Sequence, residues 1–90
     1  PRAVLQDPET ITLGAGVIIG AGSVLTTDIS VGAHTLINLN CTVGHNVRLG
    51  MGCSLMPGAH LSGEVKLKDY VLVGSGACVL NGMLIAGEAR

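Results

Sequence analysis

The chain has 90 residues, with five basic and six acidic side chains and a formal net charge of −1. Because cations are few and one tyrosine is the only aromatic residue, neither an electrostatic nor a stacking surface for nucleic acid is expected. Although 48% of the residues are hydrophobic, no run of 18 apolar residues occurs, so no transmembrane helix is predicted. No signal peptide is visible.

The first 12 residues lack a clear period. Two prolines and a mixed polar pattern in residues 1–12 predict an irregular opening coil. A single repeat domain is expected over residues 13–90. The chain begins without a methionine and stops within a repeat, and both ends of a stacked repeat protein need a cover. We therefore interpret it as a fragment.

From Leu13 onward, an aliphatic residue occupies every sixth place without a single insertion. A regular period of this length is typical of a solenoid, so it outweighs any helical or alternating-strand reading. Four places after each aliphatic residue, the side chain is mostly small or β-branched, as at Ser23, Cys41 and Ala59. The thirteen aliphatic residues are Leu13, Ile19, Leu25, Val31, Ile37, Val43, Leu49, Leu55, Leu61, Leu67, Val73, Val79 and Ile85.

Three hexads predict a triangular coil of about 18 residues, and stacked coils pair as parallel strands about 4.8 Å apart. The aliphatic residues point to the axis, and the small residues fit where each corner narrows. Glycine or asparagine directly after the aliphatic residue, as at Gly14, Gly32 and Asn38, is expected to adopt corner backbone angles that bulky residues resist. These repeats resemble the single-stranded left-handed parallel β-helix, an all-β fold, here with about five coils; the left hand follows from that resemblance.

The last residue of each hexad points outward. Wrapping the hexads by threes gives three outward columns: Ile18, Leu36, Ser54 and Leu72; Val24, Thr42, His60 and Cys78; Ser30, Arg48, Lys66 and Leu84. The first column is mostly apolar, and an exposed apolar strip usually marks an interface. Because threefold association closes naturally around a triangular rod, we expect a homotrimer. The alternative is that the aliphatic edge residues are simply tolerated.

The three cysteines do not form a disulfide framework. Cys41 and Cys53 occupy the small inward place on different sides of the prism, and Cys78 points outward. Unpaired cysteines of this kind fit a reducing compartment, so a cytoplasmic location is expected.

The three histidines are candidates for acid–base chemistry because imidazole alone titrates unassisted near neutral pH. No two of His34, His45 and His60 are separated by whole hexads, and they fall on different sides. A γ-class carbonic anhydrase on this fold needs histidines one hexad apart for a three-nitrogen zinc site. These spacings do not supply that pair, so no metal is expected, and a zinc protein is the least favoured alternative. His34 and His60 are interpreted as solvated edge residues.

The run INLNCTVGHNVRLG, continued by PGAHLSGEVKL and VLVGSGACV, resembles the acetyltransferase family of sialic acid O-acetyltransferases and UDP-4-amino-sugar N-acetyltransferases. The resemblance covers nearly the whole chain. It implies an N-terminal nucleotide-sugar-binding domain and further C-terminal coils, neither of which is visible in this sequence. It implies acetyl-CoA as co-substrate and a sugar or nucleotide-sugar hydroxyl or amine as acceptor. It also implies His45 as the general base, a role typically worth about 10²–10⁴ in rate. Direct transfer is favoured over an acyl-enzyme, because no Ser-His-Asp order is visible.

The same resemblance implies further roles around His45. Gly63, three hexads later and hence directly above it, is expected to offer its N–H to the acetyl carbonyl, a contact commonly worth about 10²–10³; a plain turn glycine is the alternative. Asn46 stands where many relatives have Asp or Glu to orient the imidazole. It can orient through its carbonyl oxygen, but it stabilises imidazolium less well than a carboxylate does.

Other implied contacts lie further from His45. Asn38 is placed near the acceptor sugar or is only a corner residue. Some relatives have a second histidine near the CoA thiol where this chain has Ser54, and Ser75 matches a main-chain contact to CoA. Arg48 and Lys66 either meet phosphates of CoA or the nucleotide sugar or form a solvated pair.

Besides the less favoured zinc protein, two functional classes remain open from sequence. The first is an acetyltransferase with its active site between subunits. The second is an inactive, trimerising β-helix rod.

Overall fold

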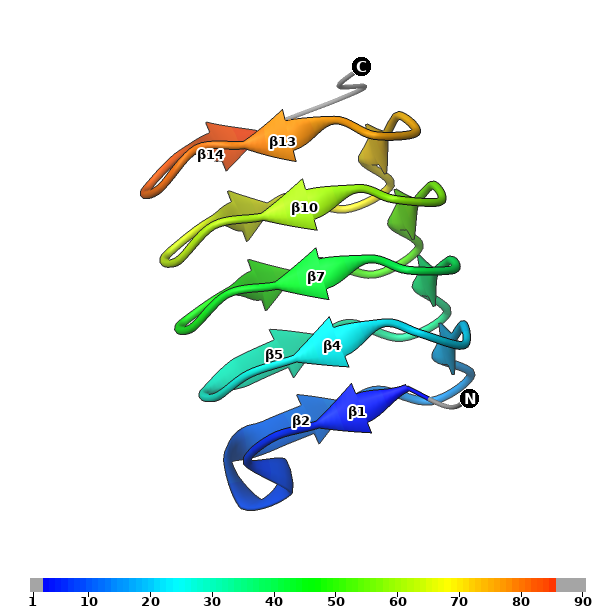
Figure 1. Cartoon of the computed structure of the whole chain (residues 1–90), viewed down its shortest axis with the longest axis vertical. Coiled ribbons are helices and arrows are strands. Elements are labelled where there is room, and N and C mark those ends of the chain that lie inside the picture. The colour runs from blue at the N-terminus through cyan, green and yellow to red at the C-terminus, as the bar shows by residue number, and fades with distance from the viewer. Residues whose placement is uncertain (1–2, 86–90) are drawn as a thin grey trace.

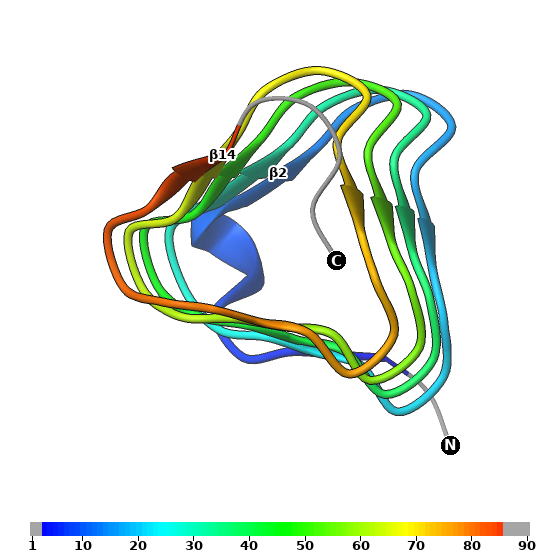
Figure 2. The same ribbon diagram turned by 90° about the horizontal axis from the view of Figure 1, so that it is seen from above.

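The computed structural model describes residues 3–85 and shows a stack of triangular coils (Figure 1). Seen along the stack, the coils superpose as three flat walls around one axis (Figure 2). Wall A contains β1 (Val4–Leu5), β4 (Val24–Leu25), β7 (Thr42–Val43), β10 (His60–Leu61) and β13 (Cys78–Val79). Wall B contains β2 (Ile11–Leu13), β5 (Ile29–Val31), β8 (Arg48–Leu49), β11 (Lys66–Leu67) and β14 (Leu84–Ile85). Wall C contains β3 (Ile18–Ile19), β6 (Leu36–Ile37), β9 (Ser54–Leu55) and β12 (Leu72–Val73).

All paired strands in the three walls are parallel. The pairing joins His60 to Thr42 and Cys78 in wall A, and Lys66 to Arg48 and Leu84 in wall B. The three outward columns predicted from sequence are therefore confirmed. The chain turns clockwise as it rises toward the viewer in Figure 2, which is the left-handed sense, and the predicted all-β solenoid is confirmed.

The core is built by the aliphatic residue of each hexad together with the small residue four places later. Leu25, Ile37 and Leu55 are fully buried, and so are Cys41 and Cys53 at the small inward place. A fully buried aliphatic side chain contributes about 1.5–3 kcal/mol. At the N-terminal end the pattern weakens, because Leu13 has a coil on only one side and is 40% exposed.

Two hydroxyl groups are also buried at the small inward place, and both are hydrogen-bonded. Thr35 Oγ1 donates to the Gly50 carbonyl at 2.9 Å and accepts from the Cys53 N–H at 3.3 Å. Ser23, at the corresponding place before wall A, makes the same pair of bonds: its Oγ donates to one backbone carbonyl and accepts from one backbone N–H. Because a buried polar group without partners is costly, these bonds let a hydroxyl stand in for a small apolar residue.

The expected role of the glycines directly after the aliphatic residues is wrong. Positive φ occurs two residues later in each hexad, at glycines such as Gly16 and at Asp28, His34, Asn40, Asn46, Glu64 and Tyr70. The glycines after the aliphatic residue serve close packing between coils instead. A Cβ added to Gly32 would lie 2.5 Å from the backbone of Gly50 and Met51 in the next coil.

The opening segment belongs to the same stack from Val4 onward. Val4 pairs with Val24, whereas Ile11 pairs with Ile29, so the offset between paired strands shortens to the regular three hexads only at β2. The 3₁₀ turn η1 (Pro8–Thr10) lies between β1 and β2 and takes up the additional length. In the part of the chain that the structure describes, no helix has the length and apolar character needed to cross a membrane.

Candidate functional site

His45 and Gly63 lie one above the other at the corner that joins wall A to wall B. His45 follows β7 and Gly63 follows β10, so both lie in the turn that leaves wall A. A Cβ added to Gly63 would lie 2.5 Å from His45 Nε2 and 2.8 Å from Cε1. The imidazole therefore rests against Gly63 with its Nε2 edge nearest. The Glu64 N–H, which donates to the His45 carbonyl at 2.8 Å, fixes the spacing of the two coils.

The amide N–H of Gly63 adds a hydrogen-bond donor to this corner. Among residues 3–85, no hydrogen-bond acceptor is found for it. Gly44 lies below, and a Cβ added there would lie 2.8 Å from the Gly63 nitrogen. Because Gly44 has no side chain, no Cβ crowds the Gly63 nitrogen from the coil below. An imidazole nitrogen and a free amide donor thus meet at one exposed corner.

A chain of hydrogen bonds leads from His45 down the stack to Asp28. Asn46 Oδ1 lies 3.0 Å from His45 Nδ1, and Asn46 Nδ2 donates to Asp28 Oδ2 at 2.8 Å. Arg48 holds the other side of Asp28, with Nη2 at 3.0 Å from Oδ1 and Nη1 donating to the Asp28 carbonyl at 2.7 Å. A carboxylate thus lies one coil below the imidazole, with the Asn46 amide between them.

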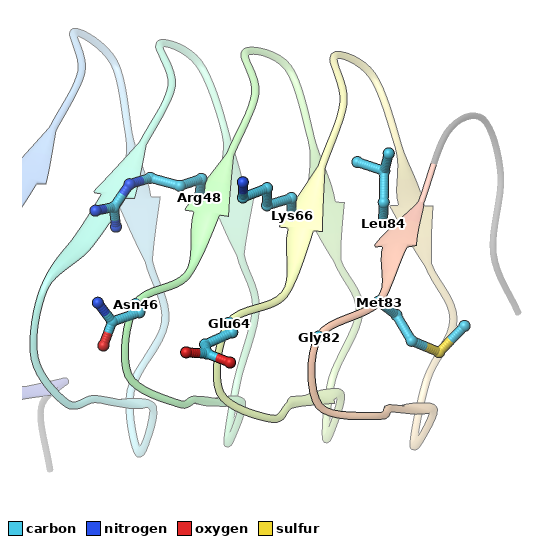
Figure 3. Close-up of a pocket in the computed structure, with 7 residues that line it drawn as sticks. All are labelled: Asn46, Arg48, Glu64, Lys66, Gly82, Met83 and Leu84. Carbon is cyan, nitrogen blue, oxygen red and sulfur yellow. The ribbon is translucent and has the colours of Figure 1, made fainter.

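A pocket of about 600 Å³ opens on wall B next to this corner (Figure 3). Its lining combines the charged side chains of Arg48, Glu64 and Lys66 with the apolar Met83 and Leu84. The Arg48 guanidinium points along the stack away from Lys66 (Figure 3) and is held by Asp28. Lys66 is therefore the better placed of the two predicted cations to meet a phosphate in this pocket.

The other predicted contact residues lie elsewhere on the chain. Ser54 is on wall C, while Asn38 and Ser75 follow β6 and β12 at the corner between walls C and A. Asn38 Oδ1 accepts the Leu39 N–H at 2.8 Å, as a corner residue does. The structure of one chain therefore does not bring these three residues to His45.

The other two histidines are separated from the His45 corner. His60 lies on wall A, and its Nδ1 is 2.7 Å from Thr42 Oγ1. His34 is at the corner between walls B and C, over Gly16. Within residues 3–85, no three His, Cys, Asp or Glu side chains gather as a metal site would require, so nothing in that range supports the zinc alternative.

The cysteines lie as the sequence predicts. Cys41 and Cys53 are buried, Cys78 is exposed, and all three are free. Burial raises the pKa of the Cys41 and Cys53 thiols above the ordinary value. Neither thiol is therefore a ready nucleophile at neutral pH.

The apolar column on wall C and the His45 corner point in opposite directions (Figure 2). Ile18 is 64% exposed at the lower end of this column, while Leu36 and Leu72 are half-buried. In a threefold ring, each copy contacts its two neighbours through two different patches of its surface. These two patches lie on neighbouring parts of the perimeter of the coil. A contact through wall C alone would therefore leave His45 uncovered.

Asp28 was not identified as a site residue from sequence. Its signal was available, because Asp28 precedes Asn46 by three hexads, which is one full coil. Only the outward strand residues were arranged into columns. The turn residues that take positive φ form columns too, and Asp28 and Asn46 belong to one of them.

No protein-family model and no curated protein matches the sequence. Solved structures do match over 97% of the chain. A hexapeptide transferase family protein from Anaplasma phagocytophilum superposes with a TM-score of 0.69 at 20% identity. The acetyltransferase domain of PglB from Neisseria gonorrhoeae gives 0.53 at 21%. A histidine-to-asparagine variant of perosamine N-acetyltransferase from Caulobacter crescentus, in complex with CoA and GDP-perosamine, gives 0.52 at 25%.

These matches show that the chain has the fold of hexapeptide transferases, and two of the three structures are acetyltransferases. The chain spans 64%, 52% and 51% of the three matched proteins. It therefore corresponds to one part of each.

Proposed function

We propose that the protein is an acetyl-CoA-dependent acetyltransferase that acts on a hydroxyl or amine of a sugar or nucleotide sugar. The observation that carries this proposal is the His45 imidazole lying against Gly63, whose N–H has no acceptor among residues 3–85. In the proposed reaction, His45 Nε2 accepts the proton that the acceptor loses as its oxygen or nitrogen attacks the acetyl thioester. The new C–O or C–N bond forms and the C–S bond breaks. The sulfur then takes the proton from the His45 imidazolium, so that CoA leaves as the thiol and the base is restored.

Gly63 N–H is proposed to donate to the thioester oxygen as negative charge develops there. A donor placed where charge forms is commonly worth about 10²–10³ in rate. Its backbone origin suits the role, since an N–H anchored between two coils needs little reorganisation during the reaction. The Glu64 N–H bond to the His45 carbonyl supports this geometry because it ties the two coils together at this corner.

The cofactor and acceptor are supported by two observations. One matched structure holds CoA and GDP-perosamine. The pocket on wall B next to the His45 corner presents the Lys66 ammonium group, which can meet a phosphate of CoA or of a nucleotide sugar. Asn38, Ser54 and Ser75 enter the proposal only through a neighbouring copy, because on one chain they lie at other walls and corners.

A homotrimer is part of the proposal and is supported by the partly exposed apolar column on wall C. A shared active site requires a further contact, in which a wall of the next copy covers the His45 corner. The free thiol of Cys78 supports a reducing, cytoplasmic environment.

The proposal is tested with the complete gene product, acetyl-CoA, and GDP-perosamine or a UDP-4-amino sugar as acceptor. We expect His45→Ala to lower the rate of thiol release by about 10²–10⁴, while His34→Ala, at another corner, keeps full activity. Equal rates for the wild type and His45→Ala would overturn the proposal.

An inactive trimerising rod is the second candidate, because the chain spans as little as 51% of a matched protein. Calorimetry of the 90-residue chain with CoA separates the two candidates. Saturable binding supports a donor site within the chain, whereas a lack of heat at millimolar CoA favours the rod.

A further inference from the structure

We infer that Asp28 is a positioning residue for His45 and acts through Asn46 to keep a free lone pair on His45 Nε2. The inference rests on the proposed function, because it concerns how the proposed base is kept ready. It adds a residue one coil away from the reacting groups. The observation that carries it is the hydrogen-bond chain from Arg48 through Asp28 and Asn46 to His45.

The direction of every bond in this chain follows from the chemistry at its lower end. The Arg48 guanidinium has hydrogen-bond donors and no acceptor, so Asp28 must accept in both of its bonds to Arg48. The Asp28 carboxylate, paired with Arg48, accepts from Asn46 as well, so the group of Asn46 that faces it must be the amide NH₂. Asn46 then turns its carbonyl oxygen to the imidazole. Because that oxygen is an acceptor, His45 Nδ1 must carry the hydrogen.

The consequence lies at the opposite edge of the ring. A neutral imidazole has one N–H and one lone pair. With the hydrogen on Nδ1, the lone pair is on Nε2, the nitrogen nearest to Gly63. The network thereby favours the tautomer that can accept a proton where the acceptor and the thioester are proposed to meet. Asn46 alone could not do this, since an amide can present either end to the ring.

The backbone conformation does not account for this pair of residues. Asp28 and Asn46 have φ of 56° and 57°, a region that Asp and Asn tolerate better than most residues. However, the same place in other hexads holds Glu64 and Tyr70 as well as glycines. The turn therefore accepts many side chains, whereas the hydrogen-bonded path from Arg48 to His45 runs through these two.

The opening coil holds Asp28 in place from below. Thr10 Oγ1 accepts the Asp28 N–H at 2.8 Å and lies 3.0 Å from Thr27 Oγ1. The Thr27 hydroxyl donates to Asp7 Oδ2 at 2.9 Å. Thr10, in the 3₁₀ turn between β1 and β2, thus holds the backbone of Asp28, whose carboxylate faces Asn46 in the next coil.

The decisive variant is Asp28→Asn, which keeps shape and tolerance for positive φ. Arg48 would hold the new amide by its oxygen and turn its NH₂ toward Asn46. Asn46 must then flip and present its own NH₂ to His45 Nδ1, which moves the hydrogen to Nε2 and removes the lone pair from the reacting edge. We expect kcat to fall about 10- to 100-fold, with the KM for acetyl-CoA within about twofold of wild type.

The double variant Asp28→Asn/Asn46→Asp reverses this effect. The carboxylate then lies next to the imidazole and accepts both from the new amide below and from His45 Nδ1–H. We expect kcat to return to within about threefold of wild type, although both residues have changed. Asn46→Gly, which removes the bridge but keeps a residue suited to the turn, is expected to lose activity like Asp28→Asn.

A second readout does not depend on turnover. Long-range ¹⁵N–¹H NMR of His45 in the complete gene product is expected to show Nδ1–H in the wild type and the double variant, and Nε2–H in Asp28→Asn. The same tautomer in all three proteins, or no recovery of kcat in the double variant, would overturn the inference. If His45→Ala stays active while the tautomer changes as expected, the proposed function fails and the hydrogen-bond relay stands.

Discussion

Replacing Gly63 by alanine tests the contact on which the proposed chemistry depends. The added methyl would lie 2.5 Å from His45 Nε2, whereas ordinary contact begins near 3.4 Å. The ring must therefore move by about 1 Å, a displacement that can cost about 10² in rate. We expect kcat to fall about 100-fold, equivalent to about 2.7 kcal/mol of transition-state stabilisation.

The fold should tolerate this substitution. Gly63 does not require left-handed backbone, and alanine already occupies the same place of other hexads at Ala15, Ala21 and Ala33. The imidazole is exposed and can swing into solvent. We therefore expect the free energy of unfolding to change by less than about 0.5 kcal/mol. The Gly63 N–H is also retained, so the loss of activity reports on the position of the imidazole.

The assay is acetyl-CoA thiol release, with thermal unfolding measured on the same samples. Ala21→Ser adds one atom at the same place of another hexad and should behave as wild type. The double variant His45→Ala/Gly63→Ala should be no slower than His45→Ala alone, since the displaced group is then absent. A fully active Gly63→Ala enzyme, or a double variant much slower than His45→Ala, would refute the reasoning.

Further predictions concern the core and the surface. Thr35→Val should lower the free energy of unfolding by about 1–3 kcal/mol in urea titrations, because the buried Cys53 N–H and the partly buried Gly50 carbonyl lose their partner. A thiol reagent should label Cys78 alone in the native protein. Since burial raises the pKa of Cys41 and Cys53 above the ordinary 9.0, the folded chain binds more protons than the unfolded chain above that pH. Stability should therefore fall as pH rises from about 9 through the raised values, and less steeply in a Cys41→Ala/Cys53→Ala variant. Leu36→Glu on wall C should reduce the mass seen by light scattering from trimer to monomer.

Each of these predictions has a contrary result. Thr42→Val, at an exposed site, is the control for the buried threonine, and equal losses in both would remove the hydrogen-bond argument. Rapid labelling of all three native thiols would contradict the burial of the inward cysteines. A pH dependence that is the same with and without the inward thiols would show that other groups cause it. An unchanged mass for Leu36→Glu would place the contact between copies on another wall.

The architecture could be predicted from sequence because one residue in six carries it. From Leu25 to Val79, the aliphatic residue of every hexad is buried. A shift of the period by one residue would expose all of these side chains. The columns followed from the same count, so the alignment of Arg48 with Lys66 and of His45 with Gly63 was predictable. The corner conformations were not, because a glycine can mark close packing as well as positive φ.

The Asp28 network was harder to predict for a physical reason. A period specifies which residues stack, but it does not specify which way an amide turns or which cation a carboxylate accepts. Because Arg48 belongs to wall B, its hydrogen-bond partner could be expected on that wall. The partner instead lies in the turn of the coil below. The amide orientation and the hydrogen-bond partners depend on side-chain conformations that the hexad repeat does not determine.

The regular offset of three hexads between paired strands has a consequence for how this protein can change. The loss or gain of one amino acid between Asp28 and Asn46 would shift every later side chain by one place along the perimeter of the coil. The Asp28 carboxylate would then be separated from the Asn46 amide. Removing one whole revolution would keep the interior aliphatic but bring a different pair together at the corner. The solenoid can thus vary in length by complete turns, while its chemistry depends on the particular coils that hold Asp28, His45 and Gly63.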